Sequence, residues 1–354
     1  MSALQYRLLD AALGRGLIPD PALRAGSRWG AWTRERREAR GGVEAQEARL
    51  RALVERMSSG PIAEQVAAAN EQHYELPAEF LGLILGPRRK YSGCLWSEGV
   101  RSLAAAEDAM LALTCERAGI ADGQRVLDLG CGWGSLSLWL AERYPGAEII
   151  GVSNSNGQRR HIEARAEELG LTNLTIVTAD VNDFEPEGAG GFDRVVSVEM
   201  FEHMRNWREL LRRISTWLEP DGRLFVHVFS HRTLPYRFQS TWAAERFFTA
   251  GLMPSHELLP RFPEDMRVVD RWAVPGTHYA RTLAAWLHNL DSNRAEAEAV
   301  IRGSGLSASD ARTLIATWRL FLLSTREIWG YRGGNRWLVS HYLLERASVP
   351  ASAP

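Results

Sequence analysis

The order of apolar and polar positions divides the chain into four regions of different texture. In the first, residues 3–57, apolar side chains recur every three or four positions among arginines and glutamates, which is the period of amphipathic helices. Prolines at 19 and 21 and the glycine pair 41–42 interrupt this period, so we predict a set of short helices. The second region, residues 62–90, predicts a helix followed by a loop.

The third region, residues 124–230, alternates short apolar runs with helical patterns. We expect strands over 125–129, 148–152, 175–177, 194–198 and 223–229, and helices over 136–142 and 158–169. This alternation is typical of βαβ units, so it predicts an α/β fold with a parallel sheet covered on both faces.

The fourth region is less regular and rich in aromatic residues. Its patterns predict strands over 266–274 and 337–344 and helices over 280–290 and 310–329. Because these helices interrupt the closing strands, we expect them to form a cap over the carboxyl edge of the sheet, where open α/β sheets bind ligands. The expected division is an N-terminal helical segment (1–75), an α/β core (76–230), and cap insertions with the closing strands (231–354).

Composition and charge leave few broad classes open. Hydrophobic residues make up 45% of the 354 positions and charged residues 24%, values that exclude a largely disordered or coiled-coil chain. The 42 basic and 43 acidic residues give a formal net charge of -1, so we predict no nucleic-acid partner and no attraction to anionic membranes. Lys90 is the only lysine, which we attribute to codon usage without functional content.

The cysteines and the apolar runs bear on the compartment. Cys94, Cys115 and Cys131 are widely spaced and form no CxxC pair, so neither a disulfide framework nor a structural zinc site is predicted. No apolar run approaches the ~20 residues of a membrane-spanning helix, and the amino-terminal residues do not have the pattern of a secretory leader. We therefore expect a cytoplasmic protein whose membrane contact, if any, is peripheral.

Residues 126–134, VLDLGCGWG, form the most informative run. A strand that ends in Gly130, Gly132 and Gly134 and then enters a helix lets backbone amides approach a ligand at the positive end of that helix. A dinucleotide fingerprint would read GxGxxG, whereas this spacing, with Asp128 two residues before the first glycine, resembles the adenosylmethionine loop of class I methyltransferases. The alternative is a tight turn without a ligand.

Further motifs follow in a fixed order along the chain. They are HYELP (73–77), YSGCLW (91–96), GVSNS (151–155), EMFEHM (199–204), VHVFSH (226–231), MPS (253–255), HYARTLAAW (278–286) and RWLVSHYL (336–343). With them the chain resembles the cyclopropane fatty acid synthase superfamily of adenosylmethionine-dependent methyltransferases over residues 60–346. Within it, VHVFSH and the closing RWLVSHYL resemble the coclaurine N-methyltransferase branch. The resemblance implies a class I methyltransferase fold, a doubly wound and mostly parallel seven-stranded sheet.

The resemblance also assigns cofactor contacts. Many class I methyltransferases carry an acid at the end of the second strand, but the superfamily uses a hydroxyl residue there and a glutamine five positions on, which Ser153 and Gln158 match. The implied contacts to S-adenosylmethionine are Tyr91, Ser92, Asp128, Gly130, Gly132, Gly134, Ser153, Asn154, Gln158, Asp180 and Val181. Asp180 has a second reading, in which it caps the turn that follows it.

Candidate catalytic groups are concentrated after the fourth expected strand. If that segment turns helical, Glu199, Glu202 and His203 share one face. Methyl transfer needs a desolvated, aimed acceptor that loses a proton; two carboxylates suit a protonated amine, and one of them or His203 can remove its proton. These residues could also supply a glutamate and a histidine to a metal ion, but no third ligand is evident, so no metal is predicted. The other alternative is that these side chains have purely structural roles.

Bicarbonate is a second possible cofactor. The cyclopropane branch uses this ion as a base, held by a cysteine, a glutamate, a histidine and a tyrosine. Glu202, His227 and Tyr279 match three of these positions, but Gly93 stands at the cysteine position. A glycine still offers a backbone amide, so bicarbonate stays open without its side-chain contact.

Together these features predict an S-adenosylmethionine-dependent methyltransferase that acts on the nitrogen of a small hydrophobic or aromatic amine. The alternative is methyl or methylene transfer to unsaturated acyl chains of lipids, which would require peripheral membrane contact. A non-catalytic binding protein would be expected to have a damaged glycine loop or a lost Glu-His pair, and both are intact. No pattern specifies an oligomeric state.

Overall fold

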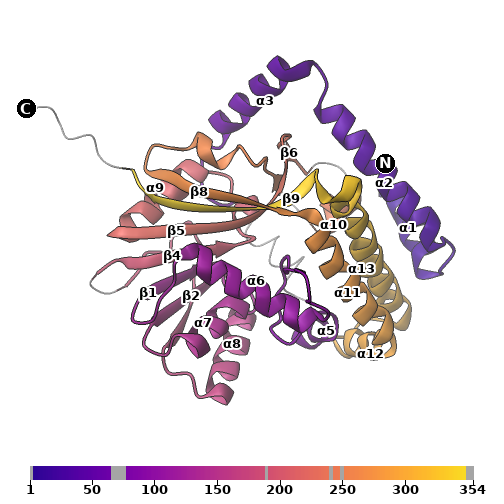
Figure 1. Cartoon of the computed structure of the whole chain (residues 1–354). Coiled ribbons are helices and arrows are strands. Elements are labelled where there is room, and N and C mark those ends of the chain that lie inside the picture. The colour runs from indigo at the N-terminus through magenta and orange to yellow at the C-terminus, as the bar shows by residue number, and fades with distance from the viewer. Residues whose placement is uncertain (1–2, 65–76, 188–189, 239–241, 248–250, 348–354) are drawn as a thin grey trace, which may run out of the picture.

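The computed structural model describes residues 3–64, 77–187, 190–238, 242–247 and 251–347 (Figure 1). Residues 73–76 of the HYELP motif, and Phe248 of the aromatic-rich fourth region, lie outside these ranges. In the described part of the chain, no helix is both long enough and apolar enough to cross a membrane.

A seven-stranded sheet in the order β3-β2-β1-β4-β5-β9-β8 forms the centre of the fold. Its strands are β1 (Arg125–Leu129), β2 (Glu148–Ser153), β3 (Leu174–Thr178), β4 (Phe192–Val198), β5 (Leu218–His231), β8 (Met266–Pro275) and β9 (Trp337–Arg346). Strands β1 to β5 are parallel, whereas β9 runs antiparallel to both β5 and β8. The prediction of a doubly wound, mostly parallel seven-stranded sheet is confirmed, and every predicted strand is present.

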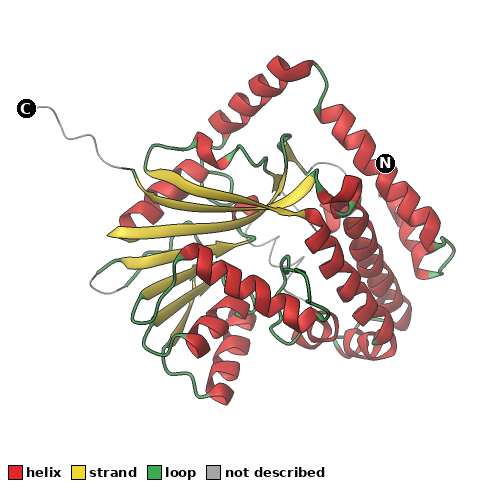
Figure 2. Ribbon diagram, viewed as in Figure 1, coloured by secondary structure: helices red, strands yellow, loops and turns green. Residues whose placement is uncertain are grey.

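Helices cover both faces of this sheet, as Figure 2 shows. Successive residues of a strand point to opposite faces, so Val126 of β1 packs with α6 (Leu103–Ala118) and α7 (Ser135–Arg143), while Leu127 packs on the side of α3 (Gly42–Arg56) and α9 (Trp207–Trp217). The helix α8 (Asn156–Leu169) packs beside β3 and carries the buried Ile162. The predicted helices 136–142 and 158–169 are thus present.

The N-terminal region forms three helices, as predicted. They are α1 (Ala3–Gly14), α2 (Asp20–Glu38) and α3 (Gly42–Arg56), separated at Pro19 and at Gly41, whose φ of 84° is left-handed. Helices α1 and α2 pack along α13 (Ala308–Trp329), and α3 continues toward the sheet (Figure 1).

The cap gathers at one end of the sheet (Figure 1). It contains α5 (Ala78–Ile84), α11 (Gly276–Ser292), α12 (Arg294–Gly303) and α13 (Ala308–Trp329), with α10 (Trp242–Phe247), the two-stranded sheet of β6 (Tyr236–Arg237) and β7 (Leu252–Met253), and a single turn at Tyr331–Gly334. Another single turn, Leu259–Arg261, packs with α3 and α9 instead. A continuous apolar cluster joins α5, α11 and α13 to α1 and α2. The predicted cap helices are therefore present, while the division at 75/76 and 230/231 stays a prediction.

Candidate active site

A cavity of about 810 Å³ lies where the carboxyl ends of β1 and β4 meet the cap. One part of its wall is the glycine loop after β1, and another is the segment 198–203 after β4. Helices α2, α11 and α13 supply much of the remaining wall, largely with apolar and aromatic side chains. Open α/β sheets bind ligands at this edge, so the cavity is the candidate active site.

The glycine loop has a backbone that only glycine adopts without strain. Gly130, Gly132 and Gly134 have φ values of 88°, 54° and 80°. A Cβ on Gly130 would lie 2.9 Å from the sulfur of Met200, and one on Gly134 would lie 2.6 Å from Ile162 Cγ1. A Cβ on Gly132 would meet no protein atom within 4 Å. Gly132 lines the cavity, so the chain backbone is open to a ligand at this point.

Polar atoms without a partner face this part of the cavity. Ser153 Oγ donates to Gln158 Oε1 at 2.6 Å, which leaves Gln158 Nε2 buried and without a hydrogen bond. Trp133 Nε1 and Ser135 Oγ are buried and unpaired as well, and both residues line the cavity. Buried polar groups are rarely left unpaired, so these atoms fit a polar ligand.

Asp128 closes the floor of the same region. It is almost fully buried, and its Oδ2 accepts a 2.6 Å hydrogen bond from Ser137 Oγ. Burial raises the pKa of Asp128 to about 6, against the hydrogen bonds from Ser137 that lower it. Together with the unpaired donors, the donor and acceptor set fits the hydroxyl and amino groups of S-adenosylmethionine.

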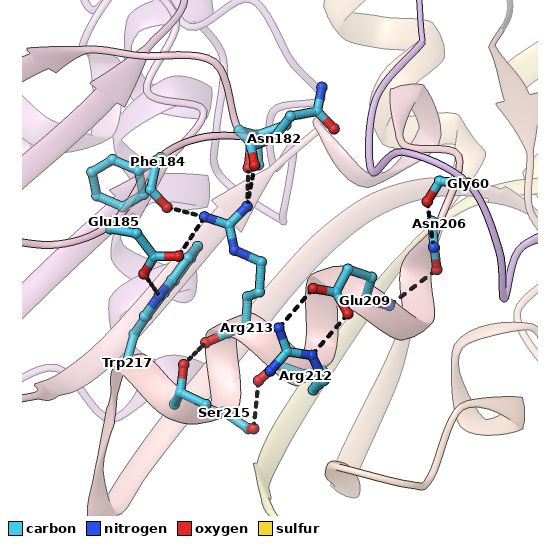
Figure 3. Close-up of polar contacts among 12 residues, drawn as sticks. Gly60, Asn182, Phe184, Glu185, Asn206, Glu209, Arg212, Arg213, Ser215 and Trp217 are labelled. Atoms are coloured by element: carbon cyan, nitrogen blue, oxygen red, sulfur yellow. Dashed lines mark hydrogen bonds and ion pairs between the residues drawn. The ribbon is translucent and has the colours of Figure 1, made fainter.

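The loop after β3 is held by α9, as Figure 3 shows. Arg213 of α9 donates to the carbonyls of Val181 and Asn182 at 2.7 Å each, and to that of Phe184. Asp180 Oδ1 accepts from the backbone amide of Asn182 at 2.8 Å and caps this turn, which was its alternative reading. The expected contacts Gly134, Ser153, Asn154, Asp180 and Val181 do not line the cavity, whereas Tyr91, Ser92, Asp128, Gly130, Gly132 and Gln158 do.

Glu199 is anchored from three directions. Its Oε1 accepts from the Gly93 amide at 3.0 Å and lies 3.4 Å from His227 Nε2, and its Oε2 accepts from the Tyr279 hydroxyl at 2.7 Å. Burial raises the pKa of Glu199 above its ordinary value, although the positive charge of Lys90 and the hydrogen bonds from Gly93 and Tyr279 act against this shift. Glu199 itself has a φ of 48°, an uncommon conformation that tends to occur at functional sites.

Glu202 has the opposite environment. Only 1% of its surface is exposed, and neither carboxyl oxygen has a hydrogen-bond partner. Burial raises the pKa of Glu202 well above its ordinary value, and the negative charge of Glu199 raises it further. The buried Glu202 carboxyl is therefore less acidic than an ordinary glutamate, and a cation entering the cavity would favour its ionised form.

The helical arrangement considered for these residues does not form. Glu202 and His203 belong to a single 3-10 turn, Phe201–His203, and Glu199 precedes it in a left-handed conformation. Glu199, Glu202 and His203 nonetheless all line the cavity, because all three directly follow the carboxyl end of β4. Tyr279 of α11 joins them there, whereas His227 of β5 is fully buried behind Glu199.

Lys90 is a functional candidate that the sequence interpretation set aside. The only lysine of the chain is almost fully buried and lines the cavity, with Nζ donating to Ser92 Oγ and, at 2.9 Å, to the carbonyl of Gly93. Burial lowers the pKa of Lys90, and the charges of Glu199 and Glu107 act against that shift. The sequence feature that could have indicated a role for Lys90 is that it is the only lysine among 42 basic residues.

The rest of the cavity is an aromatic chamber. The rings of Tyr91 and Trp286 lie 5.6 Å apart, and Tyr279 stacks on Trp329 at 4.5 Å. The chamber is also lined by Phe229, Tyr236, Phe238, Trp242, Phe321 and Trp337. Helix α2 closes it with Leu23, Gly26, Gly30 and Ala31, a contribution that sequence reasoning missed. Among the residues described, no three His, Cys, Asp or Glu side chains gather as metal ligands.

Comparisons with known proteins agree with this geometry. The family model described as mycolic acid cyclopropane synthetase matches residues 63–327. An (S)-coclaurine N-methyltransferase of Thalictrum flavum subsp. glaucum is 36% identical over 338 residues, covering 94% of this chain and 93% of the relative. The cyclopropane-fatty-acyl-phospholipid synthase of Escherichia coli K12 is 31% identical over 218 residues, covering 61% of this chain and 54% of the relative.

Solved structures give the same result. A crystal structure of a coclaurine N-methyltransferase bound to N-methylheliamine and SAH superposes with a TM-score of 0.90 at 36% identity, covering 95% of this chain and 98% of that one. The cyclopropane synthase MmaA2 of Mycobacterium tuberculosis has a TM-score of 0.66 at 23% identity, covering 80% of this chain and 98% of that one, which shows a shared fold.

Proposed function

Because the chain belongs to the mycolic acid cyclopropane synthetase family and is an S-adenosylmethionine-dependent methyltransferase, we propose that it methylates the nitrogen of a small aromatic or hydrophobic amine. The observation that carries this proposal is the Glu202 carboxyl, buried without a partner in an aromatic chamber. A buried carboxyl with two unpaired oxygens is a poor site for a neutral acyl chain and a good one for an ammonium group.

We propose that the cofactor occupies the part of the cavity beside the glycine loop. Gly130 and Gly132 would let the backbone approach it, Gln158 Nε2 would donate to it, and Tyr91 and Ser92 would border its methionine end. When bound, the cofactor supplies an electrophilic methyl group. Asp180 and Val181, in the loop after β3, do not line the cavity, so their proposed contact with the cofactor rests on the family resemblance alone.

The protein groups then act on the acceptor amine. An amine of ordinary basicity arrives protonated, and the Glu202 carboxylate binds it by pairing with the ammonium. The aromatic rings of Tyr91 and Trp286 stabilise the cation and exclude water. Glu202 or His203 takes the proton from the nitrogen and frees its lone pair for transfer.

Glu199 has a supporting role in this proposal. Its carboxylate is held by Gly93, His227 and Tyr279, which are the positions that the family resemblance assigned to a bicarbonate ion. An anchored side-chain carboxylate therefore takes the hydrogen bonds that such an ion would need. We propose that bicarbonate is not required.

The compartment is a further part of the proposal. Cys94, Cys115 and Cys131 are all free and buried, and burial raises the pKa of the Cys94 thiol to about 12. Thiols that are neither paired nor ionised suit a reducing environment, which supports a cytoplasmic location.

Labelled S-adenosylmethionine offered with two substrate pools tests the function directly. The purified protein should transfer label to benzylic primary or secondary amines and leave unsaturated phospholipid vesicles unlabelled. A Glu202→Gln variant should lose transfer to amines while binding the cofactor as before. Label in the acyl chains alone would overturn the proposal and favour the lipid alternative.

A further inference from the structure

A row of side chains crosses the sheet from its antiparallel edge to the active site. Trp272 of β8 pairs in register with His341 of β9, and His341 pairs with His227 of β5. On the other side of His227, its register partner is Val198 of β4, and Glu199 follows directly. The Glu199 amide donates to the His227 carbonyl at 2.8 Å, so the row ends at the anchored carboxylate.

Hydrogen bonds connect this row from end to end. Arg117, near the end of α6, lies 4.7 Å over the ring of Trp272 and donates from Nη1 to His341 Nδ1 at 2.7 Å. His341 Nε2 lies 2.9 Å from His227 Nδ1, and His227 Nε2 lies 3.4 Å from Glu199 Oε1. Both imidazoles have no exposed surface, so solvent supplies neither of them with a partner.

The direction of each bond follows from the arginine. A guanidinium only donates, so His341 Nδ1 must accept and its single proton must be on Nε2. His341 Nε2 then donates to His227 Nδ1, which leaves the proton of His227 on Nε2, pointing at Glu199. As long as both imidazoles are neutral, these hydrogen bonds therefore allow only one tautomer for each ring.

Burial keeps them neutral. It lowers the pKa of His227 and of His341 well below the ordinary value, and the charges of Arg117 and Lys90 lower both further. The other charged or titratable groups around Glu199 are Lys90, Cys94, Glu202, His203 and Tyr279, and those around Arg117 are Glu116 and Asp270.

We propose that Arg117 and His341 are positioning residues of the methyltransferase, which fix the Nε2–H tautomer of His227 and thereby keep a hydrogen-bond donor on the Glu199 carboxylate. With the opposite tautomer, His227 would present a lone pair to that carboxylate, and the ionised form of Glu199 would be destabilised. That the tautomer affects turnover rests on the proposed function. The assignment of the tautomers rests only on the hydrogen bonds and does not depend on that function.

Histidine nitrogen NMR tests the tautomers without any substrate. In protein labelled with ¹⁵N-histidine, His227 and His341 should both show a protonated Nε2 and an unprotonated Nδ1 between pH 6 and pH 8. In Arg117→Met, which keeps an apolar stem and removes the donor, the two signals should show a mixture of tautomers. A protonated Nδ1 on His227 in the unaltered protein would overturn the proposal, even if Arg117→Met does not fold.

Kinetics test the consequence for Glu199. Arg117→Met and His341→Phe should shift the acidic limb of the kcat/KM profile to higher pH by about one unit, a roughly tenfold loss below the limb. His341→Gln should largely restore the profile, because its amide accepts with Oε1 and donates with Nε2.

Arg194→Met is the matched control. Arg194 is also half-buried and donates to the carbonyl of Ala118 at the same end of α6, but it has no link to Glu199. The Arg194→Met substitution should lower the free energy of unfolding without shifting the pH profile of kcat/KM. Equal profiles for Arg117→Met and Arg194→Met would overturn the positioning role, whereas a failure of the unaltered protein to methylate any amine would overturn the proposed function and leave the NMR result standing.

Discussion

Glu199 and Glu202 lie three residues apart at the rim of one cavity, yet only the Glu199 carboxylate has hydrogen-bond partners in the protein. The difference comes from where the chain turns. The left-handed backbone of Glu199 directs its side chain toward Gly93 and Tyr279, and the 3-10 turn that follows brings Glu202 to the cavity wall, where nothing pairs with it. One carboxylate is therefore fixed by the fold, and the other is available to a ligand.

Replacing Glu202 should separate catalysis from cofactor binding. Glu202→Gln removes the acceptor for the ammonium and its proton, and general-base assistance contributes about 10²–10⁴-fold, so kcat/KM for amines should fall within that range. Affinity for S-adenosylhomocysteine, measured by calorimetry, should stay within about twofold. The exposed Glu296→Gln is the control and should match the unaltered enzyme. Unchanged turnover in Glu202→Gln would remove this carboxyl from the mechanism.

The same substitution should stabilise the protein, and more so at high pH. The pKa of Glu202 is raised by burial in the folded chain, so the folded state binds more protons than the unfolded state above the ordinary value of 4.5. The free energy of unfolding therefore falls as pH rises through that window, and Glu202→Gln abolishes the fall. Urea unfolding at pH 5 and pH 8 should show a larger stabilisation at pH 8; an equal gain at both would contradict the raised pKa.

His203 offers a test of how the proton leaves. His203→Ala should lower methyl transfer by about 10²–10⁴-fold at neutral pH if the imidazole is the base. Raising the pH should partly restore the rate, because solvent then supplies the deprotonated amine. Progress curves from pH 6.5 to pH 10 measure this, with Glu296→Gln as the reference. A His203→Ala enzyme with normal turnover across that range would leave Glu202 as the only base.

The glycine loop allows binding and folding to be tested separately. Gly132→Ala places a Cβ beside no protein atom but at a cavity-lining position, so it should weaken S-adenosylhomocysteine binding at least about tenfold, with only ~1–2 kcal/mol of strain from its positive φ. Gly134→Ala instead meets Ile162 and should mainly lower the free energy of unfolding. Calorimetry and urea unfolding of both variants decide this; loss of stability without loss of binding in Gly132→Ala would contradict a cofactor at the loop.

Local patterns predicted the elements that build the site. The strand 125–129 and its glycines were predictable because an apolar run and a turn that needs glycine are both encoded within nine residues. Helix α9 was not predicted, although Trp207, Leu210, Leu211 and Ile214 carry a clear helical period. The helical periodicity of α6 is weaker, because its buried residues are not confined to one face of the helix.

Contacts between distant segments were beyond such patterns. Arg117 reaches His341 across 224 positions of sequence, and nothing near either residue indicates the other. The sequence pattern of α2 is typical of a solvated surface helix. In the structure, however, its small residues close the aromatic chamber because α13 packs beside it. Both features depend on the assembled cap and sheet, and single-sequence periodicity has no access to that packing.

The anchored carboxylate predicts how the enzyme responds to small anions. Because Glu199 already accepts from Gly93, His227 and Tyr279, turnover in degassed, carbonate-free buffer should equal turnover with added bicarbonate. Glu199→Gly removes the carboxylate, relieves the positive φ and leaves those donors facing a space of carboxylate size. This variant should lose most of its activity, as removal of a charged hydrogen-bond partner costs about 1.5–3 kcal/mol. Bicarbonate, formate or acetate at millimolar concentration should restore part of the rate, while chloride at equal ionic strength should not. Strict bicarbonate dependence of the unaltered enzyme, or equal rescue by chloride, would show that Glu199 does not take the place of a bound anion.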